Sequence, residues 1–307
     1  MGGTGNRIDV IIPTRNRPRL TAEAIAAVQA QTFADWHLYV VDDASDDDTP
    51  ARLEVLAAGD PRITILRRDT RGGGNPARQT ALLASGAPLV ATCDSDDLWA
   101  PTKLERQLTA WEEAEGQADD VGVVLCWHDA LGADGARRGQ VLGSRTGRRW
   151  HPFTAFNTST PLISRAVLEE VGGFAHSTLY PLQTTDHVEL FLRLTHGHTL
   201  VTVPSLLVHC RHHGGRRNSD GERTLAAADE ARALLRDVEA DMGDRRRTRA
   251  WLNAWVAGRY LELGDSRTAM AYMATALRAN GPATGTRILS HYGPWALRQL
   301  VLQRSGS

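Results

Sequence analysis

The sequence of 307 residues has little of what would mark a secreted or membrane-spanning protein. It has only three cysteines, Cys93, Cys126 and Cys210, and they form no CxxC pair. A disulfide scaffold is therefore excluded, and a reducing compartment is expected. No apolar run reaches the roughly 18 residues that a membrane-spanning helix needs, and the opening MGGTGNR lacks the apolar core of a signal peptide. These absences predict a cytoplasmic protein.

Net charge is nearly absent as well. The 35 basic and 36 acidic residues leave a net charge of −1, which gives no sign of a nucleic-acid partner. Lys103 is the single lysine. An apolar content of 42% is that of an ordinary globular protein, so the chain can form one large domain or a domain with an appendage.

The first half of the chain alternates between short apolar runs and segments with helical spacing. Strands are expected over 8–12, 37–42, 62–66, 88–93 and 121–127, and helices over 20–31, 49–59, 75–86 and 101–115. Thr49 and Asn75 suit the N-caps of two of these helices. Continuous apolar strands that alternate with helices indicate an α/β fold with a mostly parallel sheet covered on both faces.

The second half is less regular. It contains an apolar segment and a helix within 160–174, a helix over 184–197, strands within 199–213 and a helical pattern over 224–303. The composition of residues 214–223 is that of a linker. We therefore predict an α/β domain over 1–215, with halves 1–127 and 128–215, and a helical C-terminal region over 216–307.

Polar clusters follow three of the predicted strands: TRNRP, DDASDDD and DSDD. Ligands of parallel sheets bind beyond the carboxyl ends of the strands, so these clusters should meet at one edge. Asp94 and Asp96 can face one cation, and carboxylates suit Mg²⁺ or Mn²⁺. A cation that bridges a diphosphate would explain why carboxylates that repel one another are clustered. Asp47 and Asp48 have a plainer interpretation as helix caps.

Several of these motifs together resemble family 2 glycosyltransferases of the GT-A fold. The resemblance is carried by VIIPTRNRP, VVDDASDDDT, NPARQTALLASGAPLVATCDSDDLWAPTKLERQL, STPLISRAVLEEVGGF, TDHVELFLRL and CRHHGG. It covers residues 8–215, about two thirds of the chain. It implies a nucleotide-sugar-binding, Rossmann-like domain, with a nucleotide-binding half over 1–127 and an acceptor half over 128–215.

The resemblance also implies a role for each matched residue. The donor would be bound by Pro13, Thr14, Arg15, Asp42, Asp43, Arg78, Asp94, Ser95 and Arg211. Asp43 would accept a hydrogen bond from the imide of a uracil-type ring, with Asp42 supporting it. Mn²⁺ or Mg²⁺ would be bound by Asp94, Asp96 and His213. Asp186 would be the general base.

Two positions depart from the family's pattern: Gln79 stands where asparagine is usual, and Thr185 stands where glutamate is usual. Asp186 followed by Glu189 is also typical of a capping box at a helix start, and the two roles are compatible. The Gly-rich stretch before Arg78 lacks the GK[ST] of a P-loop, so a flexible lid over the donor is expected instead.

The implied reaction is an inverting transfer of a sugar from a nucleotide donor, with UDP expected as the nucleotide. A metal and arginine would stabilise the leaving diphosphate, and a carboxylate would take the acceptor proton. The acceptor could be a glycan, a lipid-linked sugar, a natural product or a peptide. The alternatives are a sugar-1-phosphate nucleotidyltransferase, whose Gly-rich basic signature is missing, and a non-catalytic nucleotide-sugar-binding protein.

The C-terminal region has a pattern of its own. Residues 251–282 look like one tetratricopeptide-type helical hairpin, which cannot bury its apolar face alone. Three partners stay open for it: the catalytic domain, a second copy in a homodimer, and an acceptor or membrane surface.

Overall fold

The computed structural model describes residues 7–116, 120–132, 157–174, 190–191, 193–194 and 198–211, and in the C-terminal part 250, 253–254, 256–257, 260 and 265–278. The chain divides into two compact units, Met1–His213 and Gly214–Ser307. All three cysteines are free and buried. Among the described residues, no helix is both long and apolar enough to cross a membrane.

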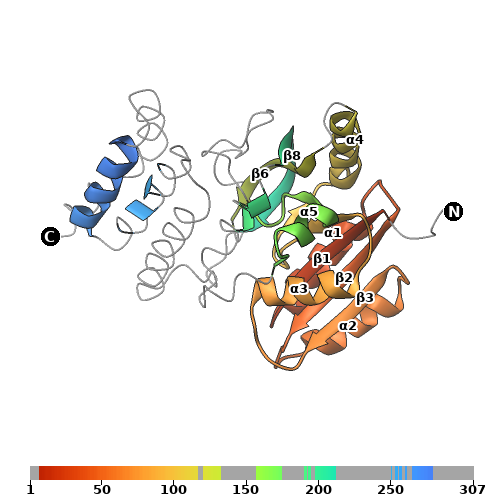
Figure 1. Cartoon of the computed structure of the whole chain (residues 1–307). Coiled ribbons are helices and arrows are strands. Elements are labelled where there is room, and N and C mark those ends of the chain that lie inside the picture. The colour runs from red at the N-terminus through yellow and green to blue at the C-terminus, as the bar shows by residue number, and fades with distance from the viewer. Residues whose placement is uncertain are drawn as a thin grey trace. The chain divides into compact units, whose positions relative to one another are not determined.

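An eight-stranded sheet organises the first unit, in the order β3-β2-β1-β4-β7-β6-β8-β5 (Figure 1). Its strands are β1 (Ile8–Thr14), β2 (Trp36–Asp43), β3 (Ile63–Arg68), β4 (Leu89–Thr92), β5 (Leu98–Trp99), β6 (Val121–Leu131), β7 (Leu162–Ser164) and β8 (Thr199–Arg211). β3, β2, β1 and β4 run parallel, and β6 and β8 are parallel to each other. β7 is antiparallel to both of its neighbours, and β5 is antiparallel to β8.

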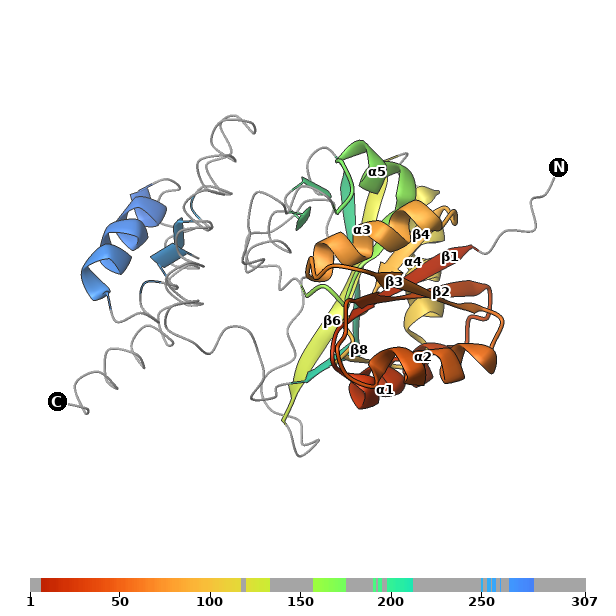
Figure 2. The same ribbon diagram turned by 90° about the horizontal axis from the view of Figure 1, so that it is seen from below.

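Helices cover both faces of this sheet (Figure 2). They are α1 (Pro18–Gln29), α2 (Thr49–Ala58), α3 (Gly74–Ala84), α4 (Lys103–Glu115) and α5 (Arg165–Glu170). One buried apolar cluster joins the sheet to α1, α2 and α4, and a second joins it to α3 and α5. The polar loops that follow β1, β2 and β4 therefore lie between two packed layers, at the carboxyl ends of parallel strands.

The predicted fold class is confirmed, because the sheet is flanked by helices and its first four strands in space are parallel. The short strands β5 and β7 were not predicted as strands. The N-cap prediction for α2 is wrong: Thr49 is its first helical residue, and its hydroxyl accepts a hydrogen bond from Arg17 N at 3.1 Å. Of the two acidic residues interpreted as caps, Asp47 accepts from Thr49 N through Oδ1 at 2.9 Å, whereas Asp48 occupies the N-cap position and its side chain makes no capping hydrogen bond.

The prediction for α3 is wrong in the same way. The helix begins at Gly74, and Asn75 lies within its first turn. The side chain of Asn75 accepts from Arg78 Nη1 at 2.7 Å instead of capping the backbone. Asn75 therefore binds the Arg78 side chain and does not make the N-cap contact that asparagine often makes at a helix start.

The second unit is described for a helix over 266–278 and for several helical residues between 250 and 260. Asp265 Oδ1 accepts from Thr268 N at 3.0 Å, which caps the later helix. Tyr260 stacks on Tyr272 with ring centroids 5.8 Å apart.

Candidate active site

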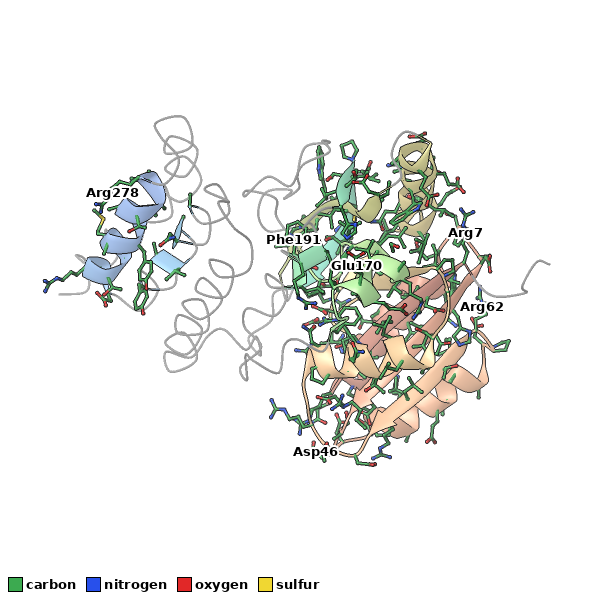
Figure 3. All side chains as sticks on the ribbon, in the orientation of Figure 1. Arg7, Asp46, Arg62, Glu170, Phe191 and Arg278 are labelled. Carbon is green, nitrogen blue, oxygen red and sulfur yellow. The ribbon has the colours of Figure 1, made fainter. Side chains whose placement is uncertain are left out.

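The loops after β1 and β2 are fastened to each other. Asn16 N donates to Ser45 Oγ at 2.9 Å, Asp46 N donates to Asn16 Oδ1 at 3.0 Å, and Arg15 Nε donates to Ala44 O at 3.2 Å. Asn16 and Ala44 both have positive φ, 52° and 57°. Figure 3 shows Asp46 at one end of the sheet and Arg62 at the other. The two loops thus form one fixed rim at the carboxyl end of the parallel strands.

Thr14, at the end of β1, faces this rim from the sheet. Its buried hydroxyl lies 2.6 Å from the hydroxyl of Thr21, which itself donates to Arg17 O at 2.7 Å. Thr14 must therefore donate to Thr21. Pro13 and Thr14 pair with Val41 and Asp42 of β2, so these predicted donor-binding residues lie side by side on adjacent strands.

Asp43 is engaged by the glycine-rich segment before α3. Its carboxylate accepts from Gly72 N at 2.9 and 3.1 Å and from Gly73 N at 2.6 Å, and Arg68 Nε lies 3.0 Å away. A Cβ on Gly72 would come within 2.9 Å of Cβ in the rigid ring of Pro76, so glycine suits this close approach. Two backbone amides of the segment expected to form a flexible lid are thus bound to Asp43 of β2 in this structure.

Asp42 has the opposite character. Its Oδ1 accepts from Ser45 N at 3.2 Å. Its Oδ2 is buried and accepts no hydrogen bond from any residue that the structure describes, and Arg67 Nε lies 3.7 Å away. Buried carboxylate oxygens without a donor are uncommon. Asp42 therefore keeps one carboxylate oxygen that is sealed from solvent and accepts no hydrogen bond within the described residues, whereas Asp43 accepts from two backbone amides.

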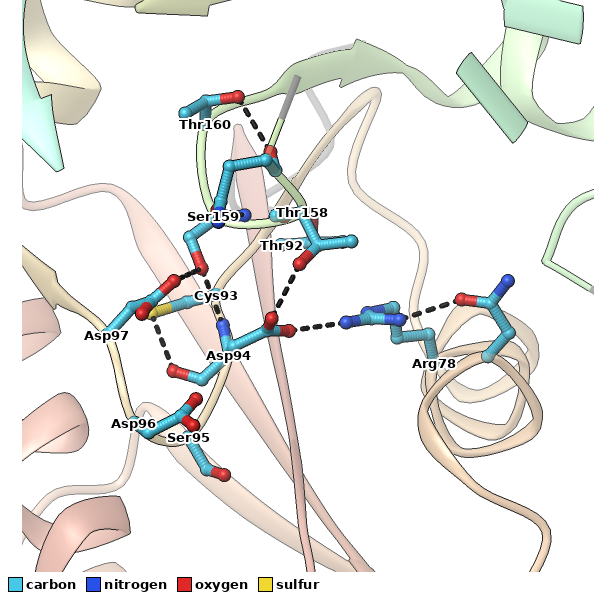
Figure 4. Close-up of polar contacts among 12 residues, drawn as sticks. Arg78, Thr92, Cys93, Asp94, Ser95, Asp96, Asp97, Thr158, Ser159 and Thr160 are labelled. Carbon is cyan, nitrogen blue, oxygen red and sulfur yellow. Dashed lines mark hydrogen bonds and ion pairs between the residues drawn. The ribbon is translucent and has the colours of Figure 1, made fainter. Parts of the chain in front are cut away.

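Asp94 opens the acidic turn that follows β4 (Figure 4). Its Oδ1 accepts from Arg78 Nη2 at 2.5 Å, and its Oδ2 accepts from Thr158 Oγ1 at 2.6 Å. Its backbone N donates to Ser159 Oγ at 2.8 Å. Arg78 is nearly completely buried and is in direct contact with Asp94. Two residues that were predicted to bind the same donor therefore lie next to each other.

Asp96 has an arginine partner from a different loop. Arg17 Nη1, from the loop after β1, lies 2.9 Å from Asp96 Oδ2 and 3.3 Å from Ser95 Oγ. The Asp96 side chain is 14% exposed and that of Arg17 is 29% exposed. Three parts of the chain that are distant in the sequence therefore meet at the acidic turn: the loop after β1, helix α3 and the segment after β4.

Asp97 is the buried third carboxyl of the turn. Ser159 Oγ lies 2.6 Å from its Oδ2, and Arg211 N donates to its Oδ1 at 3.2 Å. Burial, and then the charges of Asp94 and Asp96, raise its pKa to about 8. The repulsion expected of clustered carboxylates is therefore relieved within the protein by the two arginines and by the raised pKa of Asp97.

A turn over residues 157–160 supports the acidic turn, and sequence reasoning missed it. Ser159 O accepts from Trp99 Nε1 at 3.0 Å, Thr160 O accepts from Gln107 Nε2 at 2.9 Å, and Ser159 N donates to Asn157 Oδ1 at 2.7 Å. The only signal was a run of four small polar residues directly before an apolar segment. Such a run is typical of many loops, so it does not identify a support for a site.

The single lysine lies beneath this supporting turn. Lys103 is fully buried, its Nζ donates to Gln107 Oε1 at 2.7 Å, and it lies 3.9 Å from the centroid of the Trp99 ring. Burial lowers its pKa to about 8. Lys103 and Gln107 thus form a buried polar link between α4 and the residues that hold Asp94 and Asp97.

The end of β8 contributes backbone rather than charge to the acidic turn. The guanidinium of Arg211 pairs with Glu23 of α1, and its contact with a diphosphate stays a prediction. Two residues earlier, His209 Nδ1 lies 2.6 Å from Asp129 Oδ1. Asp186 and His213, the predicted base and third metal ligand, lie outside the described residues. Within the described part, no group of three His, Cys, Asp or Glu residues could hold a metal.

Comparison with known proteins places this site in a family. A sequence profile for glycosyl transferase family 2 matches residues 9–170. The Escherichia coli protein WfgD, a UDP-Glc:α-D-GlcNAc-diphosphoundecaprenol β-1,3-glucosyltransferase, is 38% identical over 102 residues, 33% of this chain and 40% of its own length. The succinoglycan biosynthesis protein ExoW of Rhizobium meliloti is 37% identical over 102 residues, 32% of each chain. The matched stretch spans less than half of either relative.

Solved structures with this fold extend the similarity to nearly the whole chain. The Pyrobaculum calidifontis mannosyltransferase PcManGT, in complex with GDP-Man and Mn²⁺, has a TM-score of 0.61 at 22% identity, covering 96% of this chain and 84% of its own. Residues 1–349 of S. aureus TarS, in complex with UDP-GlcNAc, give a TM-score of 0.60 at 16% identity, covering 94% and 88%. At these identities the likeness establishes the fold alone. Because the family profile spans more than half of the sequence, the chain belongs to glycosyl transferase family 2, a family of sugar-transferring enzymes.

Proposed function

We propose that the protein transfers a sugar, with inversion, from a nucleoside diphosphate sugar to a hydroxyl of an acceptor, and that it uses a divalent cation. The observation that carries the proposal is the acidic turn Asp94–Asp96, held at the end of β4 by Arg78 and Arg17. The nucleotide-binding half would be residues 1–127, the acceptor half 128–215, and the helical region 216–307.

The chemistry of the turn fits Mg²⁺ or Mn²⁺. The side chains of the turn carry carboxylate and hydroxyl oxygens, which are the ligands that these cations prefer. Both carboxylate oxygens of Asp94 are engaged by Arg78 and Thr158, so Asp96 is the better direct ligand, and His213 is the proposed third. When bound, the cation would supply charge stabilisation to the leaving diphosphate.

The unsatisfied oxygen of Asp42 supports a change in how the nucleobase is recognised. Once the groups that cover it move aside, its Oδ2 can accept from the imide N–H of a uracil ring without breaking an existing hydrogen bond, whereas the Asp43 carboxylate already accepts from Gly72 and Gly73. We therefore assign the base contact to Asp42 and a structural role to Asp43. The UDP-sugar named for WfgD and for the TarS complex supports UDP as the nucleotide.

The acceptor and the base complete the proposal. The named substrate of WfgD favours a lipid-linked sugar or another glycan as acceptor over a natural product or peptide. Asp186 would take the acceptor proton, a step typically worth about 10²–10⁴-fold in rate. Attack on the face opposite the diphosphate would invert the anomeric centre.

The test is release of nucleoside diphosphate from UDP-, GDP- and dTDP-sugars in the presence of a glycan or lipid-linked acceptor, with Mn²⁺ or with a chelator. We expect UDP release that depends on acceptor and is abolished by the chelator and by Asp96→Asn. A non-catalytic binder would bind UDP and release none, and a nucleotidyltransferase would form pyrophosphate from a sugar phosphate and UTP. Full activity in excess chelator would refute the metal assignment.

A further inference from the structure

The guanidinium of Arg17 lies where a cation would contact Asp96. Its Nη1 is 2.9 Å from Asp96 Oδ2 and 3.3 Å from Ser95 Oγ, and both partners belong to the acidic turn. The Asp96 side chain is only 14% exposed, so the ion pair is largely shielded from water. Shielded ion pairs are screened less by solvent than exposed ones. Arg17 is therefore a resident positive charge of the site.

Only the side chain of Arg17 is free to change its partner. Its backbone N donates to Thr49 Oγ1 at 3.1 Å, and its O accepts from Thr21 N at 2.9 Å and from Thr21 Oγ1 at 2.7 Å. Pro18 follows it at the start of α1. The backbone is thus anchored to two helices, while the long side chain extends over the turn.

A divalent cation and the guanidinium in its present place would compete for Asp96. Both are attracted to its carboxylate, whose Oδ2 Arg17 already contacts, and two positive charges a few ångströms apart repel strongly in a partly buried site. A cation alone offers the displaced guanidinium no new partner. A cation that arrives with a diphosphate does, because the forked donors of arginine match phosphate oxygens.

We propose that Arg17 neutralises Asp96 in the free protein and transfers its ion pair to the donor diphosphate when the cation and the donor bind together. The proposal rests on the proposed function, because it takes the donor to be a nucleoside diphosphate. Its consequence is that cation and nucleotide bind cooperatively: each makes the other's binding more favourable through one side chain. Arg17 is then both a lock on the empty site and a contact of the loaded one.

The experiment measures two affinities of the full-length protein and its Arg17→Gln variant. Mn²⁺ binding without nucleotide is followed by the electron paramagnetic resonance signal of free Mn²⁺, and UDP binding at saturating Mn²⁺ is followed by calorimetry. Loss of the internal competitor should tighten Mn²⁺ alone by about tenfold, and loss of the phosphate contact should weaken UDP by about tenfold, each corresponding to roughly 1.4 kcal/mol. These opposite signs are the signature of the proposal.

Two further variants separate this signature from loss of structure. Arg19→Gln removes a neighbouring arginine whose side chain is 80% exposed and pairs with Glu23, so both affinities should stay within twofold. Arg17→Lys keeps the charge without the forked donors, so Mn²⁺ alone should bind as weakly as in the wild type while UDP binding falls.

Unchanged or weaker binding of Mn²⁺ alone to Arg17→Gln would overturn the proposal. Tighter Mn²⁺ binding with unchanged UDP affinity would overturn the transfer to the diphosphate. Wild-type protein that fails to bind UDP with Mn²⁺ would refute the proposed function instead. The comparison of Mn²⁺ affinity between wild type and Arg17→Gln without nucleotide would still show whether Arg17 competes with the cation.

Discussion

At the scale of single residues, neighbouring carboxylates of this site make different contacts although the sequence presents them as pairs. Asp42 and Asp43 are adjacent on β2, and adjacent strand residues point to opposite faces of a sheet. Asp43 accepts from the backbone amides of Gly72 and Gly73, whereas Asp42 keeps a buried oxygen without a hydrogen-bond donor among the described residues. The sequence could predict that this pair lies at the ligand edge, but not which face holds the ligand. That choice depends on the path of the segment before α3.

The first prediction separates these two residues. Asp43→Asn should destabilise the protein by about 2 kcal/mol, because an amide group replaces an oxygen that accepts from two backbone N–H groups. Asp42→Asn should change stability little, because the oxygen that it replaces, Oδ2, accepts no hydrogen bond from the described residues. The same change should weaken UDP binding by about tenfold. Urea unfolding and calorimetry in Mn²⁺ measure the two effects. Normal stability of Asp43→Asn with lost UDP affinity would return the base contact to Asp43.

The acidic turn was also only half predictable. Its position and its oxygen chemistry follow from the apolar run that ends at Cys93 and from the spacing of Asp94 and Asp96. Its neutralisation by Arg17 and Arg78 does not, because these arginines, one in a loop and one in α3, are separated from their partners in the turn by 79 and 16 positions in the sequence. Side-chain pairing over such separations is set by the order of strands in the sheet, which no local pattern contains.

At the scale of elements, the shortest strands escaped sequence reasoning and the two longest were predicted only in part, since β6 extends four residues beyond the predicted 121–127 and β8 is one strand where two were expected. β1, β2 and β3 were predicted within two residues at each end, because they are continuous apolar runs between helices. β5 has two residues and β7 has three, too few for any periodicity. They exist because β8 and β6 offer edges to pair with. Short strands of this kind are products of tertiary structure.

The link between α4 and the supporting turn gives the second prediction of this section. Lys103 has a pKa of about 8 in the folded protein, below its ordinary value of 10.5, because it is buried. The unfolded chain therefore binds more protons than the folded one between pH 8 and 10.5, so this lysine makes stability rise with pH in that window. Lys103→Met removes the effect. The stability of wild type relative to the variant should increase by about 3 kcal/mol between pH 7.5 and 11.

Urea unfolding across that pH range tests the link, with Arg106→Met on the same helix as control. Arg106 donates to Ser205 at an exposed position, so its difference from wild type should not vary with pH. A constant difference for Lys103→Met as well would mean that the buried ammonium keeps its proton, stabilised by Gln107 and the Trp99 ring.

At the scale of the whole molecule, the two buried apolar clusters belong to one unit. No residue of these clusters, and no described residue that forms the acidic turn or its supports, lies beyond residue 211. The family predicted from the motifs is confirmed over residues 9–170. The helical region was predicted from periodicity, and its described helix over 266–278 agrees with that pattern. Its partner could not be predicted, since an amphipathic pattern does not specify what covers the apolar face.

The last prediction concerns that division. A protein ending at residue 215 should fold cooperatively and bind UDP with Mn²⁺ within about threefold of the full chain, because both apolar clusters and the described donor site are retained. Removal of 216–307 should instead lower solubility or break a homodimer, since one helical hairpin cannot bury its apolar face alone. Calorimetry and light scattering on the two forms measure these properties. If the shortened protein were soluble, monodisperse and unchanged in oligomeric state, the helical region would have to act on the acceptor. In that case the shortened protein should transfer sugar more slowly than the full chain to a lipid-linked acceptor in vesicles, and at a similar rate to a soluble glycan, while its affinity for the donor is unchanged.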